Sequence, residues 1–236
     1  MPVAAGPAYN RSVQFARLVF AVAGKDLRVE LRSREIVYTM GLFAAVIVVV
    51  FSFAFVRNQA ALIEAVPGVA WAAVVFAGTI GLGRAFDRER EGDTMRALLL
   101  APAPRLAVFA GKAIAVALLV FAVEAVALPL CLLFFNVDLG AAVGHLALVL
   151  VLGGIGFAVV GTVFAAMLLR TQARDVLLPV VLYPILVPMI MAGTKATAAL
   201  LSGNTGDAWF WTKFLGAYDV AFILVATWSF EALVIE

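Results

Sequence analysis

Six long apolar runs divide this chain, and they limit its possible folds more than any other feature of the sequence. Each run approaches the ~20 residues that a helix needs to cross the hydrocarbon layer of a membrane. The runs are continuous and lack the period-two alternation of barrel strands, so they predict helices. The predicted spans cover about residues 38–56, 66–83, 113–135, 145–169, 176–193 and 215–235.

The composition agrees with a membrane protein that forms one transmembrane domain over residues 1–236. Hydrophobic residues make up 65% of the chain and charged residues only 14%, a charged share well below that of a soluble domain. A soluble protein of 236 residues cannot bury so much apolar surface. The predicted fold class is therefore an all-α polytopic membrane protein with six transmembrane helices.

Two of the predicted spans contain residues that disturb a regular helix. The fourth apolar run extends over 141–169, which is too long for one straight helix perpendicular to the membrane. It either tilts or bends at a group of small residues that also allow close helix packing, Gly153, Gly154 and Gly156. The fifth span carries three prolines, which predict an irregular backbone: Pro179, Pro184 and Pro188.

Lys and Arg are concentrated on one side of the predicted spans. With a cytoplasmic N-terminus, only Arg57, Lys195 and Lys213 of the 17 basic residues fall on the outer side. An excess of Lys and Arg marks the cytoplasmic side of a membrane protein, so both termini are predicted to lie inside (N-in, C-in). Residues 84–105 then form the first cytoplasmic loop.

Two segments outside the spans have patterns of their own. Residues 12–37 place apolar side chains at helical spacing and basic ones on another face, which predicts an amphipathic helix along the inner membrane surface. The alternative is a plain helical extension of the first span. Residues 194–214 are predicted to be periplasmic, either as a surface loop or as a short re-entrant segment, with aromatic anchors at Trp209, Phe210 and Trp211.

Signatures of catalysis and of metal binding are missing from the sequence. It contains no phosphate-binding G-x-x-x-x-G-K-[ST] loop, no C-x-x-C-H haem attachment sequence, no H-E-x-x-H motif and no nucleophile elbow. One histidine and one cysteine exclude an intrachain disulfide and a multi-His or multi-Cys metal site. We therefore expect a non-enzymatic protein with no metal site, no covalently bound cofactor and no nucleic-acid partner.

Ionisable residues inside predicted spans are functional candidates, because a charge in hydrocarbon is costly. Glu124 lies midway along the third span, and Asp219 is predicted near the outer end of the sixth. Three interpretations of Glu124 stay open: a buried structural hydrogen bond, the lining of a substrate path or partner interface, and a proton relay. The relay is the weakest of these, because Glu124 is predicted to lie alone at its depth. His145, near the outer end of the fourth span, is better interpreted as a hydrogen-bonded interfacial residue than as a ligand of haem iron.

The charged segment RAFDREREGDTMRALLLAPAPR (84–105) is unusual in so apolar a chain. The segment is predicted to contain an amphipathic helix over 84–96, a turn at Gly92 and two later prolines. Together these would form a short, stiff cytoplasmic element to which a soluble motor protein can bind. The alternative is an ordinary solvated loop with positive-inside charge. The residues predicted to couple to such a motor are Phe86, Asp87, Glu91, Gly92, Met95 and Leu98.

This segment resembles the first cytoplasmic loop of ABC-2-type transporter permeases, through FDRERE, then GDTMRALLLAPAP, then GK at the start of the next span. Within that group the chain is similar to the haem exporter protein B (CcmB) family of the cytochrome c maturation system. The similarity continues through VPGVAW (66–71) and GFAVVGTVFAAMLLRTQARDVLLPVVLYPILVPMIMAG (156–193). It covers about residues 25–193 and implies an ABC-2-type permease with six spans, an amphipathic N-terminal helix, a coupling helix in the first loop and short re-entrant helices between spans five and six.

The resemblance also implies partners. It implies a homodimer in the bacterial inner membrane, paired with a cytosolic ATPase that alone binds ATP, together with haem-handling membrane subunits and a periplasmic haem chaperone. Haem is then a cargo, and the subunit either conducts it or converts ATP hydrolysis into release of the loaded chaperone. The single histidine and the lack of a tryptophan-rich haem motif favour release. Alternatives are an ABC-2 permease for another cargo (a lipid, polysaccharide or drug), a secondary transporter or channel, and a membrane scaffold.

Overall fold

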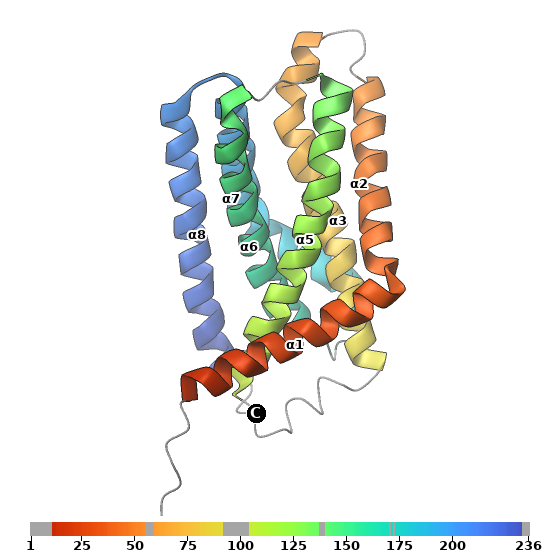
Figure 1. The fold of residues 1–236 in the computed structure, drawn as a ribbon, viewed down its shortest axis with the longest axis vertical. Coiled ribbons are helices and arrows are strands. Elements are labelled where there is room, and N and C mark those ends of the chain that lie inside the picture. Colours follow the sequence, from red (N-terminus) through yellow and green to blue (C-terminus); the bar gives the residue numbers. More distant parts are fainter. Residues whose placement is uncertain are drawn as a thin grey trace, which may run out of the picture.

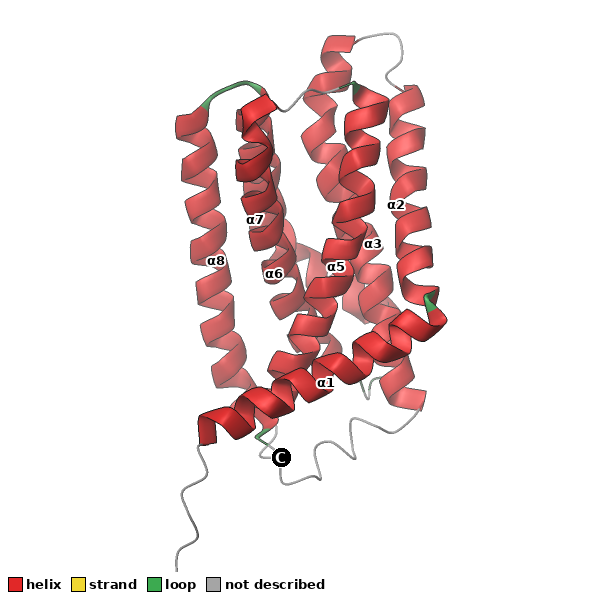
Figure 2. Ribbon diagram, in the orientation of Figure 1, coloured by secondary structure: helices red, strands yellow, loops and turns green. Residues whose placement is uncertain are grey.

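The computed structural model describes residues 11–54, 59–91, 104–136, 140–169, 171 and 173–232. Throughout this part of the chain the regular elements are helices (Figure 2). They are α1 (Arg11–Ser33), α2 (Glu35–Ala54), α3 (Gln59–Glu91), α5 (Arg105–Phe135), the short 3-10 helix η1 (Gly140–Ala142), α6 (Val143–Met167), α7 (Arg174–Leu201) and α8 (Thr205–Ala232). The all-helical prediction is confirmed for these residues.

The six helices from α2 to α8 run side by side, and α1 lies across one end of the bundle (Figure 1). We call this end the α1 end. Each of the six is long and apolar enough to cross a membrane. Arg34, with a positive φ of 54°, separates α1 from α2, so α1 is a helix of its own and not an extension of the first span. Its place at a membrane surface stays a prediction.

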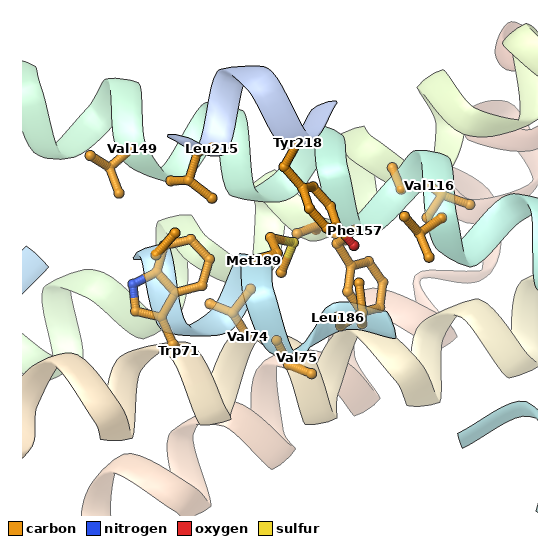
Figure 3. Close-up of a cluster of buried hydrophobic side chains, with 14 of the residues drawn as sticks. Trp71, Val74, Val75, Val116, Val149, Phe157, Leu186, Met189, Leu215 and Tyr218 are labelled. Atoms are coloured by element: carbon orange, nitrogen blue, oxygen red, sulfur yellow. The ribbon is translucent and has the colours of Figure 1, made fainter. Parts of the chain in front are cut away.

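The core of the bundle forms where α6 packs against α3, α5, α7 and α8 (Figure 3). The buried indole of Trp71 on α3 donates a hydrogen bond from Nε1 to Oγ1 of Thr197 on α7, at 3.0 Å. Gly153 on α6 and Gly193 on α7 face this ring so closely that a methyl group on either would overlap it. Glycine therefore lets three helices close around one large aromatic side chain, as the small residues of the fourth apolar run predicted.

The fourth and fifth apolar runs each form one continuous helix among the described residues. α6 continues through its glycines to Met167 without a break. α7 also continues through Pro179, Pro184 and Pro188, so the three prolines do not end the helix. The reason is packing: the opposite face of α7 is buried along its length, through residues such as Leu182 and Leu186. Packing of this kind holds the helix together where prolines remove backbone donors.

The segment 194–214 does not form a separate re-entrant element. Residues 194–201 are the last turns of α7, and residues 205–214 are the first turns of α8. Gly203, with φ of +73°, ends α7 in the left-handed conformation that favours glycine. Asn204 then caps α8, since its Oδ1 accepts a hydrogen bond from the backbone N–H of Asp207 at 3.2 Å. A tight turn between two long helices therefore replaces the predicted segment.

The charged segment 84–105 is also divided differently from the prediction. α3 continues without interruption to Glu91, so residues 84–91 extend the second span instead of forming a separate short helix. α5 begins at Arg105, eight positions before the predicted start of the third span at residue 113. Residues 92–103 lie outside the described part of the chain.

Candidate functional site

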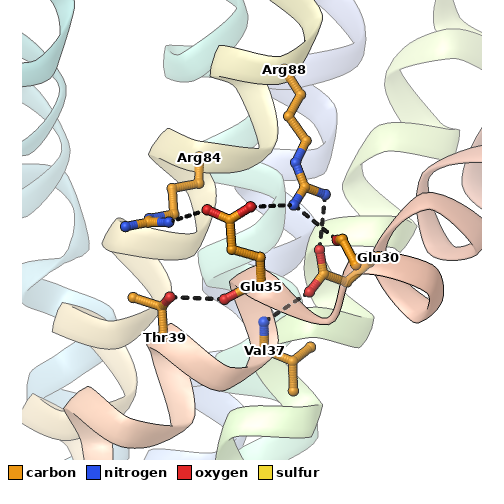
Figure 4. A network of polar contacts seen from close by, with 7 residues as sticks. Glu30, Glu35, Val37, Thr39, Arg84 and Arg88 are labelled. Atoms are coloured by element: carbon orange, nitrogen blue, oxygen red, sulfur yellow. Dashed lines mark hydrogen bonds and ion pairs between the residues drawn. The ribbon is translucent and has the colours of Figure 1, made fainter.

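The last turns of α3 carry charged side chains that contact the corner between α1 and α2 (Figure 4). Arg88 donates from Nη1 to Oε2 of Glu30 at 3.0 Å and from Nη2 to Oγ of Ser33 at 3.0 Å. Arg84 donates from Nη1 to Oε1 of Glu35 at 2.6 Å. Arg84 and Arg88 are four residues apart, so they share one face of α3. That face fixes the end of α3 to the α1–α2 corner.

Glu30 is the centre of this corner. Its carboxylate is buried, and Oε1 accepts a hydrogen bond from the backbone N–H of Val37 at 2.9 Å, which satisfies a donor in the first turn of α2. Arg88 compensates the charge of Glu30. The pair of Arg84 with Glu35 is much more exposed, and such surface pairs contribute little. The Glu30–Arg88 pair is therefore the more important of the two.

A second group of contacts joins α3 to the first turn of α7. Arg174 is 1% exposed. It donates from Nη1 to Oδ1 of Asp87 at 2.8 Å and from Nη2 to the carbonyl oxygen of Gly83 at 3.2 Å. Its guanidinium also lies 5.8 Å from the centre of the Phe86 ring, within the range of a cation–π interaction. The guanidinium therefore connects α7 to α3 through an ion pair with Asp87, a hydrogen bond to the Gly83 carbonyl and a cation–π contact with Phe86.

A third contact reaches α5 and α1 through Lys112. Its Nζ lies 5.8 Å from the centre of the Phe86 ring and 2.7 Å from Oδ2 of Asp26 on α1. Phe86 is 1% exposed and is approached by a cation from α5 and by another from α7. The end of α3 is thus connected to α1, α2, α5 and α7.

The predicted coupling residues fall in different places. Asp87 lies in the contact with Arg174, whereas the buried position of Phe86 does not fit a direct contact with a partner. Glu91 is the last residue of α3, and its side chain is not described. Gly92, Met95 and Leu98 lie outside the described residues.

Sequence reasoning missed Glu30, Lys112 and Arg174 as partners of this segment. A charged residue next to an apolar run is a signal that the sequence does contain. Which charged residues pair with one another depends on how the helices pack, and the sequence does not show this. Among the described residues, no group of three or more His, Cys, Asp or Glu side chains is arranged to hold a metal ion.

The two intramembrane carboxyl groups lie on either side of α6. A methyl group on Gly154 would lie 3.4 Å from Oε1 of Glu124 on α5, and one on Gly156 would lie 2.5 Å from Oδ1 of Asp219 on α8. Two residues of helix correspond to ~3 Å along the axis, so Glu124 and Asp219 lie at similar depth. The prediction that Glu124 is alone at its depth was wrong. So was the outer position predicted for Asp219, which lies near the middle of α8 because that helix begins at Thr205.

Both carboxyl groups are buried, with Glu124 6% and Asp219 4% exposed. Among the described residues, neither oxygen of the Asp219 carboxyl group has a hydrogen-bond partner, nor does Oε1 of Glu124. No hydrogen bond from the described part of the chain accounts for these oxygens. The functional role predicted for the two residues stays a prediction.

His145 lies near the end of the bundle opposite to α1. Its Nε2 is 2.9 Å from Oγ1 of Thr212 on α8, and its ring lies 4.4 Å from the ring of Trp209. Nearby, Nζ of Lys195 lies 5.4 Å from the Trp211 ring. The Thr212 contact engages one ring nitrogen, which agrees with the interpretation of His145 as a hydrogen-bonded residue at the end of a span.

Comparison with known proteins places this arrangement in a family. The family model described as "CcmB protein" matches residues 17–235, from α1 to the C-terminal residues. Among curated proteins, "Heme exporter protein B" of Bradyrhizobium diazoefficiens is 27% identical over 183 residues, which cover 78% of this chain and 82% of that protein. The matched region includes all six candidate spans and the contacts at the α1 end. The chain belongs to the CcmB protein family.

Proposed function

We propose that this chain is the membrane permease subunit of an ATP-driven haem-export and cytochrome c maturation system in a bacterial inner membrane. The observation that carries the proposal is the family match along residues 17–235, which spans the whole bundle. The relative named "Heme exporter protein B" supports the same function. ATP hydrolysis belongs to a separate cytosolic ATPase, and the subunit itself is non-catalytic.

The α1 end is the cytoplasmic, ATPase-facing end in this proposal. The excess of Lys and Arg in the segments at this end supports that orientation. The end of α3 and the start of α5 are held by Arg88, Arg174 and Lys112, and the chain between these two helices is the predicted coupling segment. A displacement of that segment would therefore be transmitted through these contacts to α1, α2, α5 and α7.

We favour release of a loaded haem chaperone over conduction of haem through the subunit. The close packing of Gly153 and Gly193 against Trp71 supports a bundle that moves as a unit. In this mechanism a homodimer of the chain works with two ATPase copies, with haem-handling membrane subunits and with a periplasmic chaperone. Haem is the cargo of the system as a whole.

Deletion of the gene, with complementation from a plasmid, tests the function. We expect deletion to abolish haem-stained c-type cytochromes and complementation to restore them, and we expect the tagged chain to co-purify with an ATPase in mild detergent. A partner ATPase without hydrolytic activity should fail to support maturation. Normal c-type cytochromes in the deletion strain, with an ATPase still bound, would instead favour a permease for another cargo.

The coupling role of the α3 end has its own test in the same assay. Arg88→Gln removes the charge that binds Glu30, whereas Arg28→Gln makes the same change at an exposed position of α1. We expect Arg88→Gln to lower c-type cytochrome formation while the chain still inserts, and Arg28→Gln to leave it unchanged. Equal levels of c-type cytochromes in the two variants, with equal amounts of each variant protein in the membrane, would contradict the coupling role.

A further inference from the structure

A cavity of about 290 Å³ lies at the α1 end, where α1 crosses α3 and α5. Its lining comes from four helices, since α2 also contributes Ile36. Val29 on the wall is exposed, and Lys25 is partly exposed, so the cavity is reached from the surface. The proposed function assigns no ligand to this place.

The polar and apolar parts of the lining are separated in depth. On α5 the lining residues are Lys112, Ala115, Val116 and Leu119, the i, i+3, i+4, i+7 positions of one helix face. Seven residues of helix rise by ~10 Å. The cavity therefore has a charged part beside α1 and an apolar part that reaches deeper into the bundle.

Among the described residues, the charged part of the lining has more basic than acidic side chains. Lys25, Arg88 and Lys112 line it, and the acidic residues there are Asp26 and Glu30. Asp26 contacts both lysines, with Nζ of Lys112 at 2.7 Å and Nζ of Lys25 at 3.2 Å, while Glu30 pairs with Arg88. Among the described lining residues, three basic groups against two acidic groups favour a ligand with at least one negative charge.

We propose that this cavity binds one anionic phospholipid of the leaflet in which α1 lies. The headgroup phosphate binds between Lys25 and Lys112, and the beginning of an acyl chain lies against Val116 and Leu119. Charge-assisted hydrogen bonds to a phosphate and burial of methylene groups supply the affinity. A basic, amphipathic α1 at a membrane surface places the charged part at headgroup level. The proposal goes beyond haem export and does not depend on it.

Native mass spectrometry of the full-length protein in detergent tests the site, with phosphatidylglycerol as the anionic probe and phosphatidylcholine as the zwitterionic one. We expect one tightly bound phosphatidylglycerol per chain. Lys25→Gln should weaken its binding about tenfold, because one charge-assisted hydrogen bond is lost. Ala115→Leu should weaken it by filling the apolar part of the cavity. Both variants are first checked for a single monodisperse peak in size-exclusion chromatography.

Matched controls make the same changes outside the cavity. Arg28→Gln removes a basic charge from an exposed position of α1, and Ala125→Leu enlarges an exposed position of α5. Both controls should bind phosphatidylglycerol like the unmodified chain. Unchanged binding in Lys25→Gln and Ala115→Leu would overturn the site, and equal affinity for phosphatidylcholine would overturn recognition of charge. Displacement of the lipid by haemin, with weaker haemin binding in Ala115→Leu, would assign the cavity to haem and overturn the lipid proposal.

Discussion

Arg174 and Asp87 form an ion pair, with Nη1 at 2.8 Å from Oδ1, that joins the first turn of α7 to the last turns of α3. The arginine is almost fully buried, whereas the aspartate side chain is 43% exposed. The two partners therefore differ in what happens to each charge when the ion pair is broken. The aspartate can return to water if the pair is broken, but the guanidinium stays inside the protein with part of its charge uncompensated.

Asp87→Asn should destabilise the bundle by about 1–3 kcal/mol, because a buried cation loses its charged partner. The measurement is the midpoint of thermal unfolding in detergent, followed by fluorescence-detected size-exclusion chromatography. Asp175→Asn is the matched control, since Asp175 is an exposed residue on the same turn of α7 as Arg174. Equal midpoints for the two variants would show that the pair with Arg174 contributes nothing to stability.

Gly156→Ala should separate α6 from α8. The added methyl group would lie 2.5 Å from Oδ1 of Asp219 and 3.3 Å from Sδ of Met189. Overpacking of this kind costs about 1–3 kcal/mol. Gly144→Ala on the same helix is the control, since a methyl group there meets no atom within 4 Å. We expect a lower midpoint of thermal unfolding for Gly156→Ala only, and a loss in both variants would point to a helix effect instead of this contact.

Trp71 should be more sensitive to truncation than to loss of its hydrogen bond. Trp71→Phe keeps most of the ring packing and loses the bond to Thr197, whose Oγ1 still donates to the carbonyl oxygen of Gly193 at 2.8 Å. We expect a loss of about 1 kcal/mol, against about 3–5 kcal/mol for Trp71→Ala, which leaves a cavity. Trp228→Phe, at a position 75% exposed, should leave unfolding unchanged. Equal losses for both Trp71 variants would contradict a tightly packed site.

The number and type of the spans could be predicted from the sequence, because a continuous apolar run has one stable form in a membrane. The ends of the spans could not be predicted from hydropathy. α8 begins at Thr205, ten positions before the predicted start at residue 215, because its first turns contain polar residues that lower the hydropathy. Gly203 and Asn204, which end one helix and cap the next, were the local signal for this boundary.

The same boundary error explains why the two buried carboxyl groups were not predicted to lie at one depth. Ten residues of helix correspond to ~15 Å, enough to move Asp219 from the predicted outer end to the middle of α8. At the α1 end, charge patterning drew attention to Asp87, but its contact partner Arg174 lies 87 positions away. Local sequence carries no information on which face of α7 meets α3, so the pairing depends on the packed structure.

Cysteine labelling should determine the orientation of the bundle, because the chain contains a single native cysteine. Its one cysteine, Cys131, is buried, so we expect no reaction with a membrane-impermeant maleimide in intact cells. Two exposed positions at opposite ends then serve as reporters in a Cys131→Ala background: Ser202, in the turn between α7 and α8, and Arg32, in the last turn of α1.

The N-in orientation predicts that Ser202→Cys is labelled from outside in intact cells, and that Arg32→Cys is labelled only after the membrane is permeabilised. The physical reason is the excess of Lys and Arg at the α1 end, which is retained on the cytoplasmic side during insertion. Labelling of Arg32→Cys in intact cells, with protection of Ser202→Cys, would show that the bundle has the opposite orientation. The contacts of Arg88 and Arg174 would then face the periplasm, out of reach of a cytosolic ATPase.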